Sequence, residues 1–467
     1  MITMIKTSEK QAVTIVIFGG TGDLMKKKLV PAISELIVDG YMNPKSCIVG
    51  IARGDFNDQT YKDLLLASAR NENERKAIDG MNVLFYRADS AVPGALDGLN
   101  EKLSRVEVGP CDRMFYLATS YTLFSAIAQN IVSAKLANAS SRIVFEKPFG
   151  SDLKSAKKLE KGVLSLFKEE QIYRIDHYLG KETVQNILTL RFANPLIDHV
   201  LSSQFVDKIE IVAEESADVG NRLGYYNGIG ALKDMVQNHL LQVASLVLME
   251  RPKELTADAI RDKKIEALKK LKPAPAKKQT FGQYESYQKE LLAAKLPTSK
   301  TETFCNITLH STQKRWKDTT LVLRTGKRLH HRYGRIIIHF RDVDSHHKHH
   351  SSEFTHGFVG AKSNQLIIDM HPTEDVKMLV NTRKRFTKNP IQLESIPLHF
   401  SAEEHFGPNT TDGYKRMLLD VMHADHTLFT RHDELLQSWK LIEEIQKIMP
   451  EANFIVYPDG ADPQSFL

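Results

Sequence analysis

Residues 13–29, VTIVIFGGTGDLMKKKL, carry the pattern that decides the fold of the first third of the chain. An apolar run, Val13 to Phe18, predicts a buried strand, and a glycine cluster separates it from a helical pattern. Glycine lets the backbone turn sharply and approach a pyrophosphate, and a helix N-terminus offers unpaired amide groups to an anion. We expect the nucleotide to be held by Gly19, Gly20, Thr21, Gly22, Asp23 and Leu24. A tight turn without a ligand is the alternative, because the spacing differs from the usual G-x-G-x-x-G.

The rest of the first third repeats this alternation of apolar runs and helical patterns. Four more runs predict strands, at Cys47 to Ala52, Val83 to Tyr86, Met114 to Leu117 and Ile143 to Phe145. The stretches between them predict helices, among them Leu24 to Val38, Tyr61 to Arg70 and Phe124 to Leu136. Strands that alternate with helices predict a parallel sheet covered by helices, so we expect an α/β, Rossmann-like, doubly wound dinucleotide-binding domain.

From about residue 176 the pattern changes to that of an α+β domain. A helix beginning near Lys181 should end before Pro195. A strand is expected from Lys208 to Ala213, and a long apolar-periodic helix from about Leu232 to Met249.

The remainder is rich in β-strand patterns. Residues 251–300 contain many lysines, which is typical of solvated helix faces and loops. The runs beyond them, LVLRTG, RIIIHF, QLIIDM and KMLVNT, fit a mainly antiparallel sheet, and two helical patterns close the chain. We therefore predict a Rossmann-like dinucleotide-binding domain over residues 1–175 and a larger α+β domain over residues 176–467.

Composition and charge exclude several classes of protein. The 467 residues are 42% hydrophobic and 26% charged, which suits globular domains. Neither a secretory signal nor an apolar run of about 18 residues occurs, so we expect a cytoplasmic protein that does not bind a membrane. The cysteines, Cys47, Cys111 and Cys305, lack metal-ligand spacing, and we expect neither a metal nor a disulfide. The net charge of +6 comes without a patch for nucleic acid, although it suits a phosphorylated substrate and cofactor.

Two segments place cations where open α/β sheets bind ligands. In CIVGIARGDF, Arg53 follows the second expected strand, where a basic residue accepts the 2′-phosphate of NADP; an exposed arginine without a ligand is the alternative. In RIVFEKPFG, Lys147 and Pro148 follow a strand end, and their peptide bond could be cis, against the nicotinamide, or an ordinary trans bond. The E-K-P triplet resembles that of several sugar dehydrogenase families.

A third segment, RIDHYLGKETVQN, gathers an acid, an imidazole, a phenol and an ammonium group at the start of a helix, in Asp176, His177, Tyr178 and Lys181. Such a group could be a surface ion-pair network. Together with the glycine turn, however, it resembles the signature of the glucose-6-phosphate dehydrogenase family. That resemblance covers nearly the whole chain, because FGGTGDL, VGIARG, EKPFG, DHYLGKE, DMVQNHLL, LRTGK and DHTLFTRHDELLQSW all occur in the family's order.

The resemblance implies an activity and its partners. The expected reaction is oxidation of D-glucose 6-phosphate to 6-phospho-D-glucono-1,5-lactone with hydride transfer to NADP, the first step of the oxidative pentose phosphate pathway. The resemblance implies that residues 1–175 bind NADP, with NAD as the weaker alternative cofactor. It also implies that residues 176–467 bind the substrate and form a homodimer or homotetramer. Family members with a C-terminal aromatic extension hold a second, structural NADP; here the chain ends soon after NFIVYPDG, and we expect no such site.

Residue roles follow from the same resemblance. The histidine after the family's D-x-x-Q-N pattern is the general base, which is His239 here, and Asp176 is the carboxylate that orients it. The implied ligands of the sugar and its phosphate are Lys147, His177, Tyr178, Lys181, Glu215, Asp234, Lys327 and Arg332, with Lys147 near both substrate and cofactor. The chemistry agrees, because the anomeric hydroxyl must lose a proton as hydride leaves, and a histidine of pKa about 6.5 is a suitable base. Without the resemblance, a buried helix histidine would be the favoured interpretation of His239.

The sequence departs from the family pattern at two places, and two other functions remain as alternatives. Thr119 and Ser120 stand where the family commonly has a proline-rich turn, and residues 345–356 form a histidine-rich run that could bind metal, although a solvated loop is favoured. An E-K-P oxidoreductase for an unphosphorylated sugar would not need so many cations. A catalytically silent regulator on the same fold would not need the acid and the base.

Overall fold

The computed structural model describes residues 12–107, 111–342, 358–386, 391–406 and 413–467. These residues form two compact units that are interleaved along the chain. Unit 1 comprises residues 1–180, 254–261 and 411–436, and unit 2 comprises residues 181–253, 262–410 and 437–467. The domain boundary at residue 175 stays a prediction. No helix among the described residues is long and apolar enough to cross a membrane.

Unit 1 contains the parallel sheet that the sequence predicts. Its six strands lie in the order β3-β2-β1-β4-β5-β6, and every neighbouring pair is parallel. The strands are β1 (Val13–Phe18), β2 (Cys47–Ala52), β3 (Asn82–Arg87), β4 (Asp112–Leu117), β5 (Arg142–Phe145) and β6 (Ile172–Arg174). The strand order reverses beside β1, which is the point where doubly wound sheets bind ligands. The prediction of a Rossmann-like fold is confirmed.

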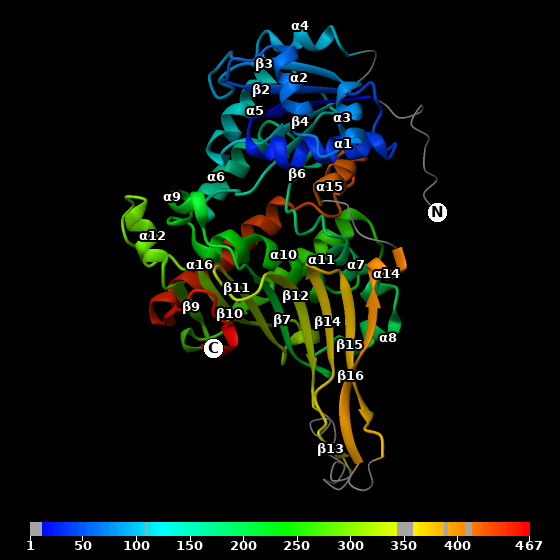
Figure 1. Ribbon diagram of the computed structural model, residues 1–467, viewed down its shortest axis with the longest axis vertical. Coiled ribbons are helices and arrows are strands. Elements are labelled where there is room, and N and C mark those ends of the chain that lie inside the picture. The colour runs from blue at the N-terminus through cyan, green and yellow to red at the C-terminus, as the bar shows by residue number, and fades with distance from the viewer. Residues whose placement is uncertain (1–11, 108–110, 343–357, 387–390, 407–412) are drawn as a thin grey trace. The chain divides into compact units, whose positions relative to one another are not determined.

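Helices pack around this sheet, as the blue to cyan ribbons of Figure 1 show. They are α1 (Val30–Val38), α2 (Asp58–Leu66), α3 (Glu72–Asp79), α4 (Leu99–Ser104), α5 (Phe124–Ser133) and α6 (Leu153–Leu164). The helix expected from Leu24 to Val38 is not uniform, because a π-helical segment, η2 (Met25–Leu29), precedes α1. Pro31 explains the break, since proline has no N–H to donate and its ring clashes with the carbonyl four residues earlier in an α-helix.

A late part of the chain completes unit 1. Helix α15 (Gly413–Met422) contributes Tyr414, Met417, Leu418 and Val421 to the same buried apolar cluster as β1 and α1. The chain approaches so closely at its start that a Cβ on Gly180 would lie 2.7 Å from the carbonyl oxygen of Gly413. The core of the nucleotide-binding unit therefore includes residues far along the sequence.

Unit 2 is built on an eleven-stranded, mainly antiparallel sheet, in the order β13-β16-β15-β14-β12-β7-β11-β10-β9-β17, with β8 paired to β10. The long strands β12, β14, β15 and β16 run side by side in Figure 1. The strands are β7 (Val206–Glu214), β8 (Leu271–Pro273), β9 (Thr280–Tyr284), β10 (Phe304–Ser311), β11 (Thr320–Gly326), β12 (Tyr333–Phe340), β13 (Phe358–Val359), β14 (Gln365–His371), β15 (Asp375–Arg383), β16 (Ile391–Ser401) and β17 (Asn453–Tyr457). The expected α+β architecture is confirmed, although β17 and a short 3-10 helix, η11 (Pro463–Ser465), follow the last two long helices.

The helices of unit 2 include the one that carries Asp234 and His239. They are α7 (Glu182–Phe192), α8 (Pro195–Val200), α9 (Leu223–Tyr226), α10 (Leu241–Leu248), α12 (Tyr287–Ala293) and α14 (Ala402–Phe406), while α11 (Ala257–Lys269) and α16 (His432–Ile448) belong to both units. The single α-helix expected from Leu232 to Met249 is wrong in its first half. Residues Leu232–Leu240 form a π-helix, η6, and α10 continues from it.

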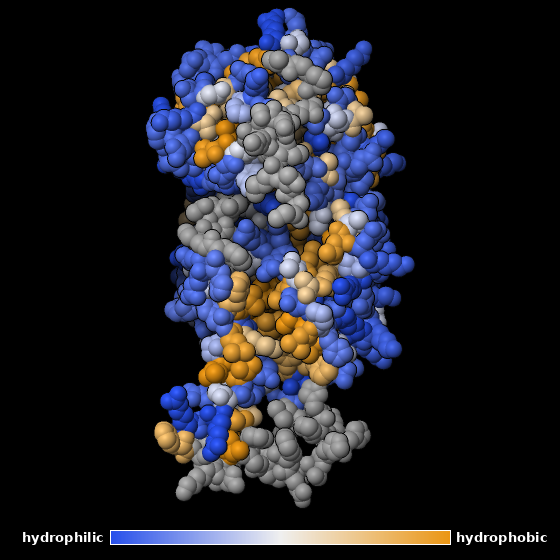
Figure 2. Space-filling view, turned by 90° about the vertical axis from the view of Figure 1, so that its right-hand side faces the viewer, coloured by the Kyte–Doolittle hydropathy of each residue, from blue (hydrophilic) through white to orange (hydrophobic). Residues whose placement is uncertain are grey.

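One face of unit 2 carries exposed apolar side chains. Figure 2 shows orange, apolar atoms gathered in the lower half of the view, at the height where Figure 1 places β14, β15 and β16. Among the exposed large apolar residues of β16 are Ile396 and Leu398, which are 39% and 57% exposed. Burial of such a surface against another protein would be favourable.

Candidate active site

The glycine turn of unit 1 lies at the carboxyl end of β1, between the ends of β2 and β4. The N–H groups of Gly19 and Gly20 both donate to the carbonyl oxygen of Ile51, at 2.9 and 3.2 Å. Gly19 has a φ of +84°, and a Cβ there would lie 2.4 Å from the carbonyl oxygen of Ala118. Only glycine fits this turn, so the first half of the motif has a structural role of its own.

The second half of the turn is the part that is open to a ligand. Gly22 and Asp23 are exposed, and Thr21 and Leu24 are partly exposed at the start of η2. Lys27 pairs with Asp23 at 3.0 Å, and this hydrogen bond lowers the pKa of Asp23. An exposed backbone turn that leads into a helix is the arrangement that binds pyrophosphate in doubly wound folds.

The ends of β2 and β3 carry two guanidinium groups. Arg53 is exposed just after β2, and Arg87 ends β3. The neighbouring acid, Asp55, is paired with Arg87 at 2.8 Å. Arg87 therefore offsets the charge of Asp55 close to Arg53, an ion pair that the sequence motifs did not indicate.

The E-K-P turn follows β5, and its Lys147–Pro148 peptide bond is cis. The preceding carboxylate, Glu146, accepts hydrogen bonds from the hydroxyls of Tyr116 and Tyr414. Burial raises the pKa of Glu146 to about 7, although these hydrogen bonds oppose the shift. Sequence reasoning missed Tyr414, because it comes from α15 and no local pattern connects it with this turn.

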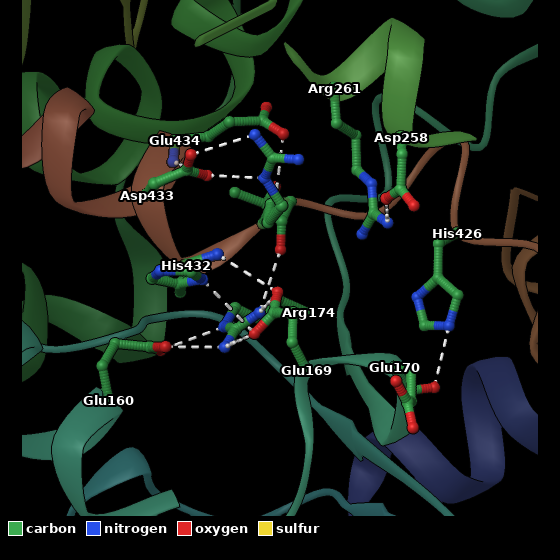
Figure 3. A network of polar contacts seen from close by, with 12 residues as sticks. Glu160, Glu169, Glu170, Arg174, Asp258, Arg261, His426, His432, Asp433 and Glu434 are labelled. Carbon is green, nitrogen blue, oxygen red and sulfur yellow. Dashed lines mark hydrogen bonds and ion pairs between the residues drawn. The ribbon is translucent and has the colours of Figure 1, made fainter. Parts of the chain in front are cut away.

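The D-H-Y-L-G segment directly follows β6, whose last residue is Arg174. This guanidinium is 1% exposed and makes two-pronged ion pairs with Glu160 of α6 and Glu169, with N–O distances from 2.6 to 3.0 Å. Figure 3 shows Arg174 between these carboxylates, with His432 beside Glu169. Although burial opposes the shift, His432 and Arg174 lower the pKa of Glu169 to about 2.

This buried network fixes the segment that leads into the proposed ligands. Asp176, two residues beyond Arg174, is 2% exposed and accepts the N–H of Tyr178 at 3.0 Å. The rings of His177 and Tyr178 lie edge to face at 5.2 Å. The structure thus brings these three motif residues together in unit 1.

In unit 2, the π-helix η6 holds the candidate base. His239 is fully buried and Asp234 is 9% exposed. At its end the N–H of Leu241 donates to the carbonyl oxygen of Val236, five residues earlier, as in a π-helix. In an α-helix, residues 234 and 239 would point about 140° apart, whereas a five-residue repeat brings them toward one side.

Beside η6 lies a pair of opposite charges. Lys327, at the end of β11, is 4% exposed and forms an ion pair with Glu215, which follows β7. The ammonium of Lys327 also lies 5.5 Å from the ring centre of Tyr226. Burial, and then the charge of Asp234, raise the pKa of Tyr226 well above its usual value. Tyr226 therefore lies close to both Lys327 and Asp234. No sequence motif indicated Tyr226 as a residue of this site.

A second cluster in unit 2 is strongly cationic. The ammonium of Lys181 lies 3.4 Å from the carbonyl oxygen of Met370, at the end of β14. Burial lowers the pKa of the next residue, His371, and the charges of Lys181 and Arg332 lower it further, while Glu215 opposes them. Lys181, Arg332 and Glu215 are therefore close to His371, which sequence reasoning missed because it lies on a distant strand.

Among the described ranges, no group of three or more His, Cys, Asp or Glu side chains could hold a metal ion. The histidine-rich run 345–356 lies outside the described residues. Cys47, Cys111 and Cys305 are free thiols.

Comparisons with known proteins agree on one family. The description "Glucose-6-phosphate dehydrogenase, NAD binding domain" matches residues 16–186, and "Glucose-6-phosphate dehydrogenase, C-terminal domain" matches residues 188–465. The chain is 37% identical to the glucose-6-phosphate 1-dehydrogenase of Rhizobium meliloti, over 92% of this chain and 90% of that one. It is 34% identical to the enzyme of Mycolicibacterium smegmatis, over 96% and 93%. A solved glucose-6-phosphate dehydrogenase in complex with its substrate glucose 6-phosphate superimposes with a TM-score of 0.87, at 29% identity, covering 97% of this chain and 95% of that chain.

A substitution of Arg174 tests whether its ion pairs stabilise the D-H-Y-L-G segment. Arg174→Lys keeps the charge but loses the planar fork, so it cannot serve both Glu160 and Glu169. Each lost charge-assisted hydrogen bond costs about 1.5–3 kcal/mol, so we expect a lower thermal midpoint together with a lower kcat. Arg105→Lys is the control, because its pair with Glu101 is exposed and should contribute little. Equal midpoints for the two variants would show that the network does not stabilise unit 1.

Proposed function

The chain belongs to the glucose-6-phosphate dehydrogenase family, NAD(P)-dependent oxidoreductases, and on that premise we propose how its own residues carry out the reaction. The observation that supports the proposal best is that unit 2 contains both a fully buried histidine and a cationic cluster. His239 and Asp234 come from one π-helix, and Lys181, Arg332 and His371 gather where a phosphate would be held.

His239 acts as the general base. Its imidazole accepts the proton of the hydroxyl on C1 of glucose 6-phosphate while hydride leaves the same carbon, and the product is 6-phosphoglucono-1,5-lactone. Asp176 orients the imidazole and stabilises the imidazolium that forms. The carboxylates of Glu215 and Asp234 hold sugar hydroxyls, and His177, Tyr178 and Lys147 complete the sugar and phosphate contacts.

The phosphate is bound by Lys181, Arg332 and Lys327, assisted by His371. A guanidinium offers a planar fork to phosphate oxygens, and ammonium groups add point charges. Burial is the main cause of the lowered pKa of His371, and the charges of Lys181 and Arg332 add to it, which supports this role because an incoming dianion would neutralise those charges. An unphosphorylated sugar would leave these charges without a partner.

The residues of unit 1 fit NADP. The exposed turn Thr21 to Leu24 would bind the pyrophosphate, and Arg53 would pair with the 2′-phosphate, while Arg87 holds Asp55 away. When bound, the cofactor supplies the acceptor of the hydride. No metal is part of this proposal.

We also propose that the enzyme works in the cytoplasm as a homodimer or homotetramer. The exposed apolar side chains on β16, Ile396 and Leu398, support association between copies through the sheet of unit 2. Sedimentation of the purified protein as a monomer, or its recovery with membranes, would contradict this part of the proposal.

Substrate choice is the first test. We expect glucose 6-phosphate to reduce NADP with a kcat/KM at least about a hundredfold above that of free glucose, because two or more charge-assisted contacts of about 1.5–3 kcal/mol each would be lost. Steady-state assays with both sugars, monitored by nicotinamide absorbance, measure this ratio. Comparable values would favour an oxidoreductase for unphosphorylated sugars.

The base is tested by His239→Asn. Loss of general-base catalysis should lower kcat by about 10² to 10⁴, while the KM for glucose 6-phosphate stays near that of the wild type. Asp176→Asn should also be slow, because the imidazole loses its orienting charge. Lys181→Ala is the comparison, and it should chiefly raise KM. If His239→Asn kept its kcat, the base would have to be sought elsewhere, at His177 first.

Cofactor preference is tested by Arg53→Ala. A charge-assisted contact to phosphate contributes about 1.5–3 kcal/mol, so the Kd for NADP should rise by roughly 10- to 150-fold. The Kd for NAD, which has no 2′-phosphate, is the internal control and should change little. Fluorescence titration with each nucleotide gives both constants, and equal losses would mean that Arg53 does not recognise the 2′-phosphate.

A further inference from the structure

The start of the π-helix η6 is held by a residue that lies 70 positions away in sequence. The N–H of Leu232 donates to Oε1 of Glu302 at 3.0 Å. The N–H of Ala231 donates to the backbone carbonyl of the same residue at 2.9 Å. Glu302 precedes β10 and is 6% exposed, so its carboxylate acts as a buried N-terminal anchor.

The chain leaves room for this carboxylate by means of one glycine. Gly230 has a φ of +72°, and a Cβ there would lie 2.3 Å from Oε1 of Glu302. Any larger residue would displace the carboxylate and would also be strained at that φ. The Glu302 carboxylate can therefore occupy its place at the start of the helix only because residue 230 is a glycine.

The anchor matters because the register of η6 decides where the reactive groups point. Asp234 and His239 share a side only while the segment keeps its five-residue hydrogen-bond pattern. A π-helix is rare and is found mostly at functional sites, so its persistence over nine residues needs support from the surrounding structure. Two first-turn amides fixed by a buried residue supply that support.

We propose that Glu302 is a positioning residue of the reaction: its hydrogen bonds to Ala231 and Leu232 set the register of the π-helix that presents His239 and Asp234. This inference rests on the proposed function, in which His239 is the base. It adds a residue that does not touch the substrate and acts through the helix.

The chemistry of the anchor suggests a conservative replacement. Burial raises the pKa of Glu302 to about 7, while the Leu232 amide, its own amide and Lys233 oppose the shift. The carboxyl therefore exists in both protonation states near neutral pH, and each state leaves an oxygen that accepts the Leu232 N–H. A glutamine amide has the same shape and the same acceptor.

The test compares four variants in the full-length enzyme. Glu302→Ala should lower kcat roughly 10- to 100-fold, because small displacements of a catalytic group have effects of this size. Glu302→Gln should restore kcat to within about threefold of the wild type at neutral pH. Gly230→Ala should reproduce the loss of kcat, and the double variant with Glu302→Ala should be no slower than the slower single variant.

Two controls separate positioning from general destabilisation. Gln279→Leu removes a fully buried side chain with three hydrogen bonds at the other end of β10, and it should lower the thermal midpoint without changing kcat. Gly228→Ala meets no atom closer than 3.9 Å and should be neutral. If Glu302→Ala lowered the midpoint but kept wild-type kcat, as the Gln279 control should, the positioning role would be wrong.

The same series distinguishes this inference from the proposed function. An inactive His239→Asn together with a fully active Glu302→Ala would overturn the inference alone. A fully active His239→Asn would overturn the role of His239, whatever the Glu302 variants did. A Glu302→Gln variant as slow as Glu302→Ala would also contradict the inference, because shape and acceptor would then not suffice.

Discussion

The buried guanidinium of Arg174 is the interaction on which the polar half of unit 1 depends. An isolated charge could not remain there, because removing it from water costs several kcal/mol unless partners compensate. Glu160 and Glu169 compensate it from two elements, and the carbonyl of Thr430 adds a contact from the late part of the chain. The network thus holds β6 in one position. Because the D-H-Y-L-G residues directly follow β6, their positions are fixed by the same network.

Buried polar groups also support the two segments that carry Lys147 and His239 in the proposed reaction. Each reactive segment is supported by a buried carboxyl that does not itself react: Glu146 beside Lys147, and Glu302 beneath η6. A buried carboxyl whose hydrogen bonds are incomplete is costly, which makes alternative positions of the segment unfavourable. Rigid placement of this kind is what a reaction at a single carbon requires.

The sequence predicted the elements of unit 1 well, because parallel strands are continuous apolar runs bounded by turn residues. Its five expected strands are all present, and only the three-residue β6 was missed. The π-helix could not be predicted, because the apolar pattern of residues 232–249 suits an α-helix equally and the hydrogen bonds at its start come from Glu302, 70 positions away. The proximity of His371 to Lys181 could not be predicted from the sequence either, because it depends on the register of distant strands.

The motifs nevertheless indicated most of the residues that the structure gathers within each unit. Asp176, His177 and Tyr178 are adjacent in sequence, and Asp234 and His239 share one helix, so local chemistry was sufficient there. What a motif cannot supply is the packing around it. Tyr226 and Tyr414 became visible only through their contacts with Lys327 and Glu146.

The interleaving of unit 1 also has a consequence for how the protein is made. Residues 1–180 leave the ribosome long before α15, yet the buried cluster around β1 and α1 includes Tyr414, Met417 and Leu418. At roughly 5–20 residues per second, the nascent nucleotide-binding unit waits on the order of ten seconds or more with part of its apolar core uncovered. Translation therefore delivers the strands of unit 2 from β7 to β16 before α15 and delivers β17 after it, so the cores of both units are completed only when the last part of the chain is synthesised.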